Sequence, residues 1–204
     1  MRYLVLSPHT DDGELGCGGT INKLLEQDNE VIYVAFSCAE LSIPKGFKKG
    51  TTRQENLKAL KILGIKNPII LNFPTRNFSK YRQNILEEII KINKKFSPDV
   101  VFLPSSYDTH QDHQVIFNEG FRAFKKICML GYELPWNNLT FKTQAFSLLE
   151  ERHVIEKAKA LAEYKSQAMK YYMTEDFIES LAKARGVQIG SHYAEAFEAV
   201  RWII

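Results

Sequence analysis

Two short segments of the chain concentrate histidine and aspartate side chains. The first contains His9, Asp11 and Asp12, and the second is the run DTHQDH at residues 108–113. Together they hold three of the five histidines in the chain. Imidazole and carboxylate groups bind borderline divalent cations such as Zn²⁺, and they also transfer protons near neutral pH. The two segments are therefore candidates for a metal-dependent hydrolytic site.

The residue types suggest which side chains would bind a metal ion. His9, Asp12 and His113 would supply two neutral imidazoles and one carboxylate, and would leave a coordination position open for water. A bound cation lowers the pKa of water from about 15.7 towards about 7. Asp11 could then accept a proton from this water as a general base, because adjacent side chains on an extended turn diverge and need not share one role.

His110 and Asp112 complete the predicted catalytic set. His110 would stabilise the oxyanion or protonate the leaving nitrogen, and Asp112 could fix the tautomer of His110 and raise its basicity. Each motif alone is a weak signal, because histidine and aspartate also cap helices and occupy turns. The two motifs together are a much stronger signal, because each one follows a predicted buried strand.

The first half of the chain predicts alternating strands and helices. Its apolar runs are nearly continuous, as in parallel strands that are buried on both faces. Helical patterns separate these runs, which is the order of βαβ units. Strands are expected at residues 3–6, 31–36, 69–71 and 100–103, and helices at residues 20–27, 52–63 and 79–96. We expect an α/β fold in which a Rossmann-like parallel sheet with a mixed edge is flanked by helices, in a single domain over residues 1–204.

The second half of the chain has less regular patterns. Helices are expected at residues 115–127, 154–172 and 174–185, strands at residues 145–149 and 196–204, and an extended or turn segment at residues 131–138.

In the first half of the chain, the spacing Thr52-x-x-Glu55 is that of a capping box, which predicts where a helix begins.

Four glycines, at positions 13, 16, 18 and 19, follow the first acidic pair. Dinucleotide-binding fingerprints also place glycines between a strand and a helix. Here the G-x-G-x-x-G spacing is not met, and the two carboxylates that precede the glycines would repel a pyrophosphate. The glycines are better explained by tight turns and by close approach of the backbone to a neighbour.

The composition is that of a folded protein with nearly balanced charge. Lysine and arginine total 27, aspartate and glutamate total 24, and 45% of the residues are hydrophobic. The densest basic run, at residues 45–49, is short, so no nucleic-acid partner is expected. No run approaches the roughly 20 apolar residues of a membrane span, and no signal-peptide pattern is present. Three cysteines without a C-x-x-C pair favour a reduced, cytoplasmic protein.

The two segments resemble the signature of the LmbE-like (PIG-L) zinc-dependent de-N-acetylase family. That family usually has Pro-His-Pro-Asp-Asp and His-Pro-Asp-His, and here Thr10 and Gln111 stand where the family has proline. The change at Thr10 should alter loop rigidity more than chemistry. Similar segments cover nearly the whole chain: GCGGT at 16–20, Arg53 and Glu55 before 59–64, YKSQ at 164–167 and YAEAF at 193–197.

The resemblance implies a zinc-dependent hydrolase that removes N-acetyl groups from amino sugars, either N-acetylglucosamine-type sugars or glycoconjugates, and releases acetate. It implies one zinc ion per chain on His9, Asp12 and His113, with Asp11 as the base and His110 acting on the transition state. Fe²⁺ could occupy the same ligands.

Three further residues are candidates for substrate binding. Arg53 and Arg76 could hold a hydroxyl or phosphate group through the guanidinium fork, and Tyr193 could donate a hydrogen bond to the oxyanion. Two other functions stay open: a metal-dependent hydrolase of another amide or of a phosphoester, and a non-catalytic Rossmann-like module for a nucleotide or sugar nucleotide. The oligomeric state also stays open, and a homo-oligomer is possible.

Overall fold

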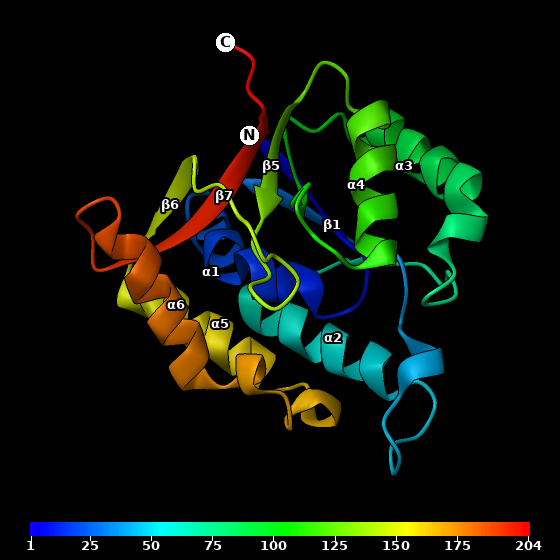
Figure 1. The fold of residues 1–204 in the computed structure, drawn as a ribbon, viewed down its shortest axis with the longest axis horizontal. Helices are drawn as coiled ribbons and strands as arrows, with labels where there is room; N and C mark the ends of the chain where they lie inside the picture. The colour runs from blue at the N-terminus through cyan, green and yellow to red at the C-terminus, as the bar shows by residue number, and fades with distance from the viewer.

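The computed structural model describes residues 1–204 as one seven-stranded sheet with helices on both faces (Figure 1). The strands are β1 (Arg2–Ser7), β2 (Glu30–Ala35), β3 (Ile69–Ile70), β4 (Val100–Pro104), β5 (Cys128–Tyr132), β6 (Ala145–Leu149) and β7 (Tyr193–Arg201). They lie in the order β3-β2-β1-β4-β5-β7-β6. The first five strands are parallel, and β7 is antiparallel to both β5 and β6. The predicted α/β class with a parallel sheet and a mixed edge is confirmed.

Two apolar layers hold the helices against the sheet. The helices are α1 (Asp12–Glu26), α2 (Thr51–Leu63), α3 (Arg82–Phe96), α4 (Gln111–Ala123), α5 (Glu151–Leu161) and α6 (Glu175–Val187). Figure 1 shows α3 and α4 side by side on one face of the sheet, with the other four helices on the opposite face. Successive side chains of a strand point to opposite faces. Leu4 and Leu6 therefore pack in the cluster beneath α3 and α4, whereas Val5 packs in the cluster beneath α1.

The sheet order brings the two histidine and aspartate segments together. β1 and β4 are parallel neighbours, with Tyr3 opposite Val100 and Val5 opposite Phe102. The carboxyl ends of parallel neighbours meet at one edge of the sheet, which is where ligands bind in open α/β folds. One segment follows the end of β1 and the other follows the end of β4.

Helix α1 begins at Asp12, well before the start that periodicity predicts at Thr20. The helix is interrupted at Cys17, whose φ of −147° and ψ of 26° are not helical. The interruption frees backbone N–H groups, and those of Gly19 and Thr20 donate to the buried carboxylate of Glu195 at 3.1 and 2.7 Å. Glycine has a poor helix propensity, so the apolar periodicity does not reveal a helix that starts with several glycines. The start of α1 depends instead on the carboxylate of Glu195 from β7.

The helix predicted at residues 154–172 is shorter in the structure. α5 begins at Glu151 and ends at Leu161, and residues 165–173 contain two short 3₁₀ turns. Past residue 161 the apolar side chains do not share one environment: Tyr164 is 1% exposed, whereas Met169 is 94% exposed. Tyr164 faces the interior from a loop, and periodicity alone does not distinguish such a loop from a helix.

Two other local predictions also differ from the structure. The capping box is absent, because the Thr52 hydroxyl donates to the carbonyl of Cys38 and Glu55 accepts from the backbone N–H of Ser166 at 2.9 Å. Strand β5 at Cys128–Tyr132 was not predicted: it begins directly after the stretch predicted as helix at residues 115–127 and overlaps the start of the extended or turn segment predicted at residues 131–138. Tertiary partners outweigh the local signals in both cases.

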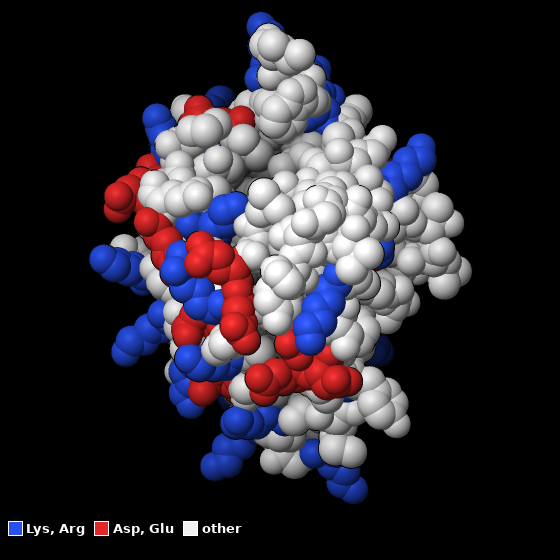
Figure 2. Space-filling view, turned by 90° about the vertical axis from the view of Figure 1, so that its left-hand side faces the viewer, with Lys and Arg blue, Asp and Glu red and all other residues white.

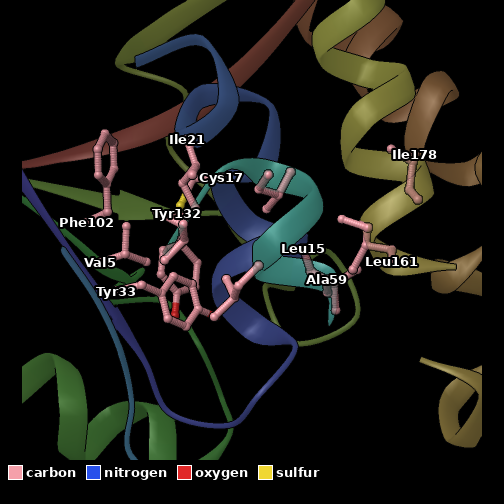
Figure 3. Packing of buried hydrophobic residues seen from close by; sticks show 14 of the residues in the cluster. Val5, Leu15, Cys17, Ile21, Tyr33, Ala59, Phe102, Tyr132, Leu161 and Ile178 are labelled. Atoms are coloured by element: carbon pink, nitrogen blue, oxygen red, sulfur yellow. The ribbon is translucent and has the colours of Figure 1, made fainter. Parts of the chain in front are cut away.

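The glycines of α1 allow this helix to lie close to the sheet. In Figure 3, Tyr33 and Tyr132 lie between the strands and α1. A Cβ atom at Gly13 would lie 2.6 Å from the hydroxyl of Tyr33, and one at Gly16 would overlap the ring of Tyr132. Close approach of helix and sheet is therefore the physical reason for glycine at both positions.

The outer surface mixes charges of both signs. Figure 2 shows the face on the side of β6, α5 and α6, where basic and acidic side chains lie beside each other and next to an uncharged area. None of the helices has both the length and the apolar composition that spanning a bilayer requires.

We predict that Gly16→Ala destabilises the protein by about 1–3 kcal/mol, because the new methyl group forces the ring of Tyr132 to move. Urea unfolding of both proteins measures the difference. Gly120→Ala is the matched control: its Cβ would meet methyl groups of Leu103 and Leu6 at 3.2 and 3.4 Å, and the gain in helix propensity offsets that contact. Equal unfolding midpoints for Gly16→Ala and the wild type would contradict the close-packing account.

Candidate active site

Three side-chain atoms from the two segments converge at the carboxyl ends of β1 and β4. His9 Nδ1 lies 3.0 Å from Asp12 Oδ2, and His113 Nε2 lies 3.1 Å from the same oxygen. The two ring nitrogens are 3.2 Å apart. His9, Asp12 and His113 are all at least nine-tenths buried. The structure therefore brings together the three residues that the sequence nominated as metal ligands.

The geometry of these three atoms fits a divalent cation. With bonds of about 2.0–2.2 Å, donor atoms of a tetrahedral zinc site lie about 3.3 Å apart. The observed separations of 3.0, 3.1 and 3.2 Å are close to this value. His110 also lies near, since ring nitrogens of His9, His110 and His113 fall within 4.8 Å of one another. The cluster can hold one cation and leave a position open for a small molecule.

The charges in the cluster depend on one another. Burial alone would raise the pKa of Asp12, but the rings of His113 and His9 outweigh it and hold this pKa well below its usual range. Burial alone would lower the pKa of His113, but Asp12 and Asp108 outweigh it and raise the pKa to about 10. A metal ion that binds these atoms must replace the protons of the rings, so metal binding here releases protons.

Each candidate imidazole ligand has a carboxylate on its second ring nitrogen. Asp108 Oδ2 lies 2.8 Å from His113 Nδ1, and Asp112 Oδ2 lies 3.1 Å from His9 Nε2. Such outer carboxylates orient metal-binding imidazoles and raise their basicity. The expected pairing of Asp112 with His110 is not what the structure shows, because the carboxylate of Asp112 contacts His9 from the other segment.

Asp112 also anchors a loop that follows β3. Its carboxylate accepts the backbone N–H groups of Arg76 at 2.6 Å and Phe78 at 3.2 Å. Arg76 has a φ of +67°, a left-handed conformation that is unusual for a residue with a side chain. The same carboxylate therefore supports a metal-ligand candidate and the loop that carries Arg76.

His110 is held as a neutral ring with a defined tautomer. Its Nδ1 accepts the backbone N–H of Asp112 at 3.2 Å, so the proton of the neutral ring is on Nε2. Burial lowers the pKa of His110 to about 4, and the positive charges of His113 and His9 act in the same direction. His110 lines the cleft, where Nε2–H can donate a hydrogen bond to a ligand.

Asp11 also lines the cleft and is only partly buried. Burial raises the pKa of the Asp11 carboxyl, and the neighbouring charge of Asp12 raises it further, whereas Lys170 acts in the opposite direction. A carboxylate with a raised pKa is a better proton acceptor at neutral pH. Asp11 therefore has the position and the basicity of a general base.

The cleft above the cluster has a volume of about 420 Å³ and a mainly polar lining. Its rim includes Trp136 and Tyr172, whose rings stack with centroids 3.7 Å apart at an angle of 11°. Lys170 and Arg76 also line the cleft. Polar groups beside aromatic rings suit a ligand with several hydroxyl groups and an apolar face.

Two of the three predicted substrate-binding residues are not among the residues that line the cleft. The guanidinium group of Arg53 lies 4.0 Å from the sulfur of Cys38. The hydroxyl of Tyr193 donates to Glu179 at 3.2 Å, on the surface between α6 and β7. Within the YAEAF segment, Glu195 has the structural role instead, because it caps the interrupted helix α1. Only Arg76 of the three lies at the cleft.

Sequence reasoning assigned no role to several residues that support the site. Asp108 lies in the second motif, where the catalytic roles were assigned to His110 and Asp112. Glu14, Asn56 and Tyr164 come from three segments and meet beside Thr10. A polar residue inside an otherwise apolar helical pattern is the available signal for Asn56, and this signal does not indicate its partners.

The fold and the site together define an α/β protein with a histidine–aspartate–histidine cluster at the carboxyl edge of a Rossmann-like sheet. A family model described as GlcNAc-PI de-N-acetylase matches residues 4–124, which is more than half of the chain. The chain belongs to this PIG-L de-N-acetylase family. The family assignment agrees with the resemblance seen in the two motifs.

Individual proteins of related sequence are also deacetylases by name. The uncharacterized deacetylase YaiS of Escherichia coli K12 is 31% identical over 169 residues, which cover 80% of this chain and 90% of YaiS. The diacetylchitobiose deacetylase of Thermococcus kodakarensis is 27% identical over 138 residues, which cover 64% of this chain and 50% of that protein. The solved N,N′-diacetylchitobiose deacetylase of Pyrococcus horikoshii has the same fold, with a TM-score of 0.81, 24% identity and coverage of 97% of this chain and 82% of that chain.

We predict that His110 titrates near pH 4 in chelator-treated protein, rather than near the usual value of about 6.5. Burial and two neighbouring positive rings oppose its protonation. NMR titration of the ring signals measures the midpoint. His113→Gln removes one of these positive charges, so the His110 midpoint should rise in that variant. A wild-type midpoint near 6.5 would contradict this electrostatic account.

Proposed function

We propose that this protein is a zinc-dependent hydrolase that removes the N-acetyl group of an amino sugar and releases acetate. The observation that carries the proposal is the convergence of His9 Nδ1, Asp12 Oδ2 and His113 Nε2 within 3.2 Å beside a polar cleft. Membership of a de-N-acetylase family supports the choice of an N-acyl substrate. The proposal covers the metal, the reaction and the class of substrate.

His9, Asp12 and His113 would hold one Zn²⁺ ion per chain. Nitrogen and carboxylate oxygen ligands suit zinc, and Fe²⁺ could bind the same set. When bound there, such a cation supplies Lewis acidity, which polarises an amide carbonyl and makes a water molecule more acidic. Asp108 and Asp112 would orient the two imidazoles from their outer nitrogens.

The protein's own groups would move the protons of the reaction. Asp11 takes a proton from the attacking water while the water oxygen forms a bond to the amide carbon. The carbonyl oxygen becomes negatively charged, and His110 Nε2–H donates a hydrogen bond to it. Asp11 then passes the proton to the sugar nitrogen, the C–N bond breaks, and the amine and acetic acid leave; the acid then gives up its proton to solvent or to the amine and becomes acetate.

The cleft fits an N-acetylglucosamine-type sugar or glycoconjugate. Trp136 and Tyr172 provide an aromatic rim, and Arg76 and Lys170 provide cations that can bind hydroxyl or acidic groups. The relative from Thermococcus kodakarensis is named a diacetylchitobiose deacetylase, and diacetylchitobiose is an N-acetylated amino sugar of the proposed class. The three cysteines are unpaired, which supports a reducing, cytoplasmic location.

The reaction and its metal dependence are tested by acetate release from a small library. The library holds N-acetyl-hexosamines, diacetylchitobiose and phosphoesters, each assayed with chelator and after zinc is added back. We expect acetate from at least one N-acetyl sugar, loss with chelator and recovery with zinc. Phosphate release without acetate would favour the alternative hydrolase, and binding of a nucleotide without turnover would favour a non-catalytic module.

The assignments of base and ligand make opposite predictions for metal content. Asp11→Asn should lower kcat by about 10²–10⁴-fold and leave zinc content near that of the wild type, because only the proton acceptor is removed. His113→Ala should lower zinc content as well as activity. Elemental analysis and acetate release measure both. Normal turnover by Asp11→Asn, or unchanged zinc in His113→Ala, would show that the respective assignment is wrong.

A further inference from the structure

Four polar side chains lie buried beside the peptide that joins Thr10 to Asp11, and the proposed chemistry does not use them. They come from separate elements: Glu14 from α1, Tyr33 from β2, Asn56 from α2 and Tyr164 from the loop after α5. Each is at most 1% exposed, and none lines the cleft. Burying four polar side chains is costly unless they bond to one another or to the backbone.

The carbonyl oxygen of Thr10 is the point where these groups meet. The hydroxyl of Tyr164 lies 2.6 Å from it, and Nδ2 of Asn56 lies 2.7 Å from it. Both groups also contact Glu14 Oε1, at 2.5 and 2.9 Å. The hydroxyl of Tyr33 bonds to the other carboxyl oxygen of Glu14. Asn56 Nδ2 has two protons and can donate to Thr10 and to Glu14 at once, whereas the single hydroxyl proton of Tyr164 goes to one of them. Glu14 thus keeps both side chains beside the carbonyl.

Two donors on one carbonyl restrict the orientation of the whole peptide plane. A peptide unit is planar, so the direction of the Thr10 carbonyl also sets the direction of the Asp11 N–H. The Cα atom from which the Asp11 side chain extends lies in the same plane. Thr10 is not proline, so no ring fixes its φ angle. The hydrogen bonds from distant elements therefore control how the Asp11 carboxylate is presented to the cleft.

We propose that Tyr164 and Asn56, supported by Glu14, are positioning residues for the base Asp11. They hold the Thr10–Asp11 peptide so that the Asp11 carboxylate is aimed at the attacking water. This inference rests on the proposed function, because it concerns the base of that reaction. It predicts an effect on kcat, since misplacing a reacting group by about 1 Å can lower the rate by about 10²-fold without weakening substrate binding.

The test compares Tyr164→Phe with the wild type. This variant keeps the buried ring and removes the hydroxyl that contacts Thr10 and Glu14. We expect kcat to fall by about 10- to 100-fold, with KM and bound zinc within about twofold of the wild type. If Tyr164→Phe does not fold, Asn56→Ala takes its place. Because Oδ1 of Asn56 has no partner, the hydrogen bonds that Asn56→Ala removes are those of Nδ2.

Two further variants separate positioning from general stability. Glu14→Gln keeps the shape of the side chain and an amide oxygen that can accept from Asn56, so it should keep kcat within about threefold of the wild type. Tyr3→Phe is the matched control, because its hydroxyl contacts only the sulfur of Met1, at 3.5 Å. It should leave kcat unchanged. An unchanged kcat in Tyr164→Phe, or a rise of KM alone, would overturn the proposal.

A crystal structure of Tyr164→Phe gives a readout that does not depend on activity. We expect the Thr10 carbonyl and the Asp11 carboxylate to rotate away from their wild-type positions. Unmoved atoms would overturn the positioning role. If the wild type releases no acetate from any N-acetyl sugar, the proposed function fails, and the crystal structures alone then decide whether these residues position Asp11.

Discussion

Charge balance among buried groups at the carboxyl edge of the sheet is the constraint on which the rest of the site depends. His9 lies between Asp12 and Asp112, and His113 lies between Asp12 and Asp108. Three carboxylates thus surround two imidazoles in a region closed to most solvent. Buried charge on this scale is stable only when it is paired or coordinates a metal. Two ring protons or one divalent cation supply two positive charges against the three negative ones, and the backbone N–H groups bonded to Asp112 offset part of the remainder. The same cluster therefore suits a divalent cation.

The carboxylate of Asp112 links the metal-ligand cluster to the wall of the cleft. It contacts His9 on one side and the backbone N–H groups of Arg76 and Phe78 on the other. A movement of this loop would therefore be transmitted to His9 through the carboxylate of Asp112. The Thr10 carbonyl forms a comparable link on the side of Asp11, where it receives donors from Asn56 and Tyr164. Hydrogen bonds between a backbone group and a side chain of another element thus support both the ligand cluster and the proposed base.

Loops form much of the cleft wall, whereas the ligand cluster lies where two strands end. The rim residues Trp136, Lys170 and Tyr172 come from segments between regular elements. Such segments tolerate sequence change better than buried strands do. This division allows the residues of the cleft wall to change without a change in the ligand cluster.

Local sequence patterns were sufficient for the strands β1 to β4 and for the residues of the cluster, but not for β5. The continuous apolar runs at residues 3–6 and 100–103 indicated β1 and β4, because only buried parallel strands are apolar on both faces. Adjacency in the chain then placed His9, Asp12 and His113 at the ends of those strands. Arg53 and Tyr193 also lie in segments that resemble the family, but their side chains contact Cys38 and Glu179 and are not among the residues that line the cleft.

The amino-acid sequence by itself determined the class of fold, the family and the candidate ligands, because each depends on residues that are close together in the chain. The tertiary structure alone decided which imidazole Asp112 supports, that α1 begins at Asp12 and that α5 ends at Leu161. It also decided that Tyr164 reaches Thr10 from 154 positions away. These features depend on hydrogen bonds and packing between distant segments, and local periodicity carries no information about such partners.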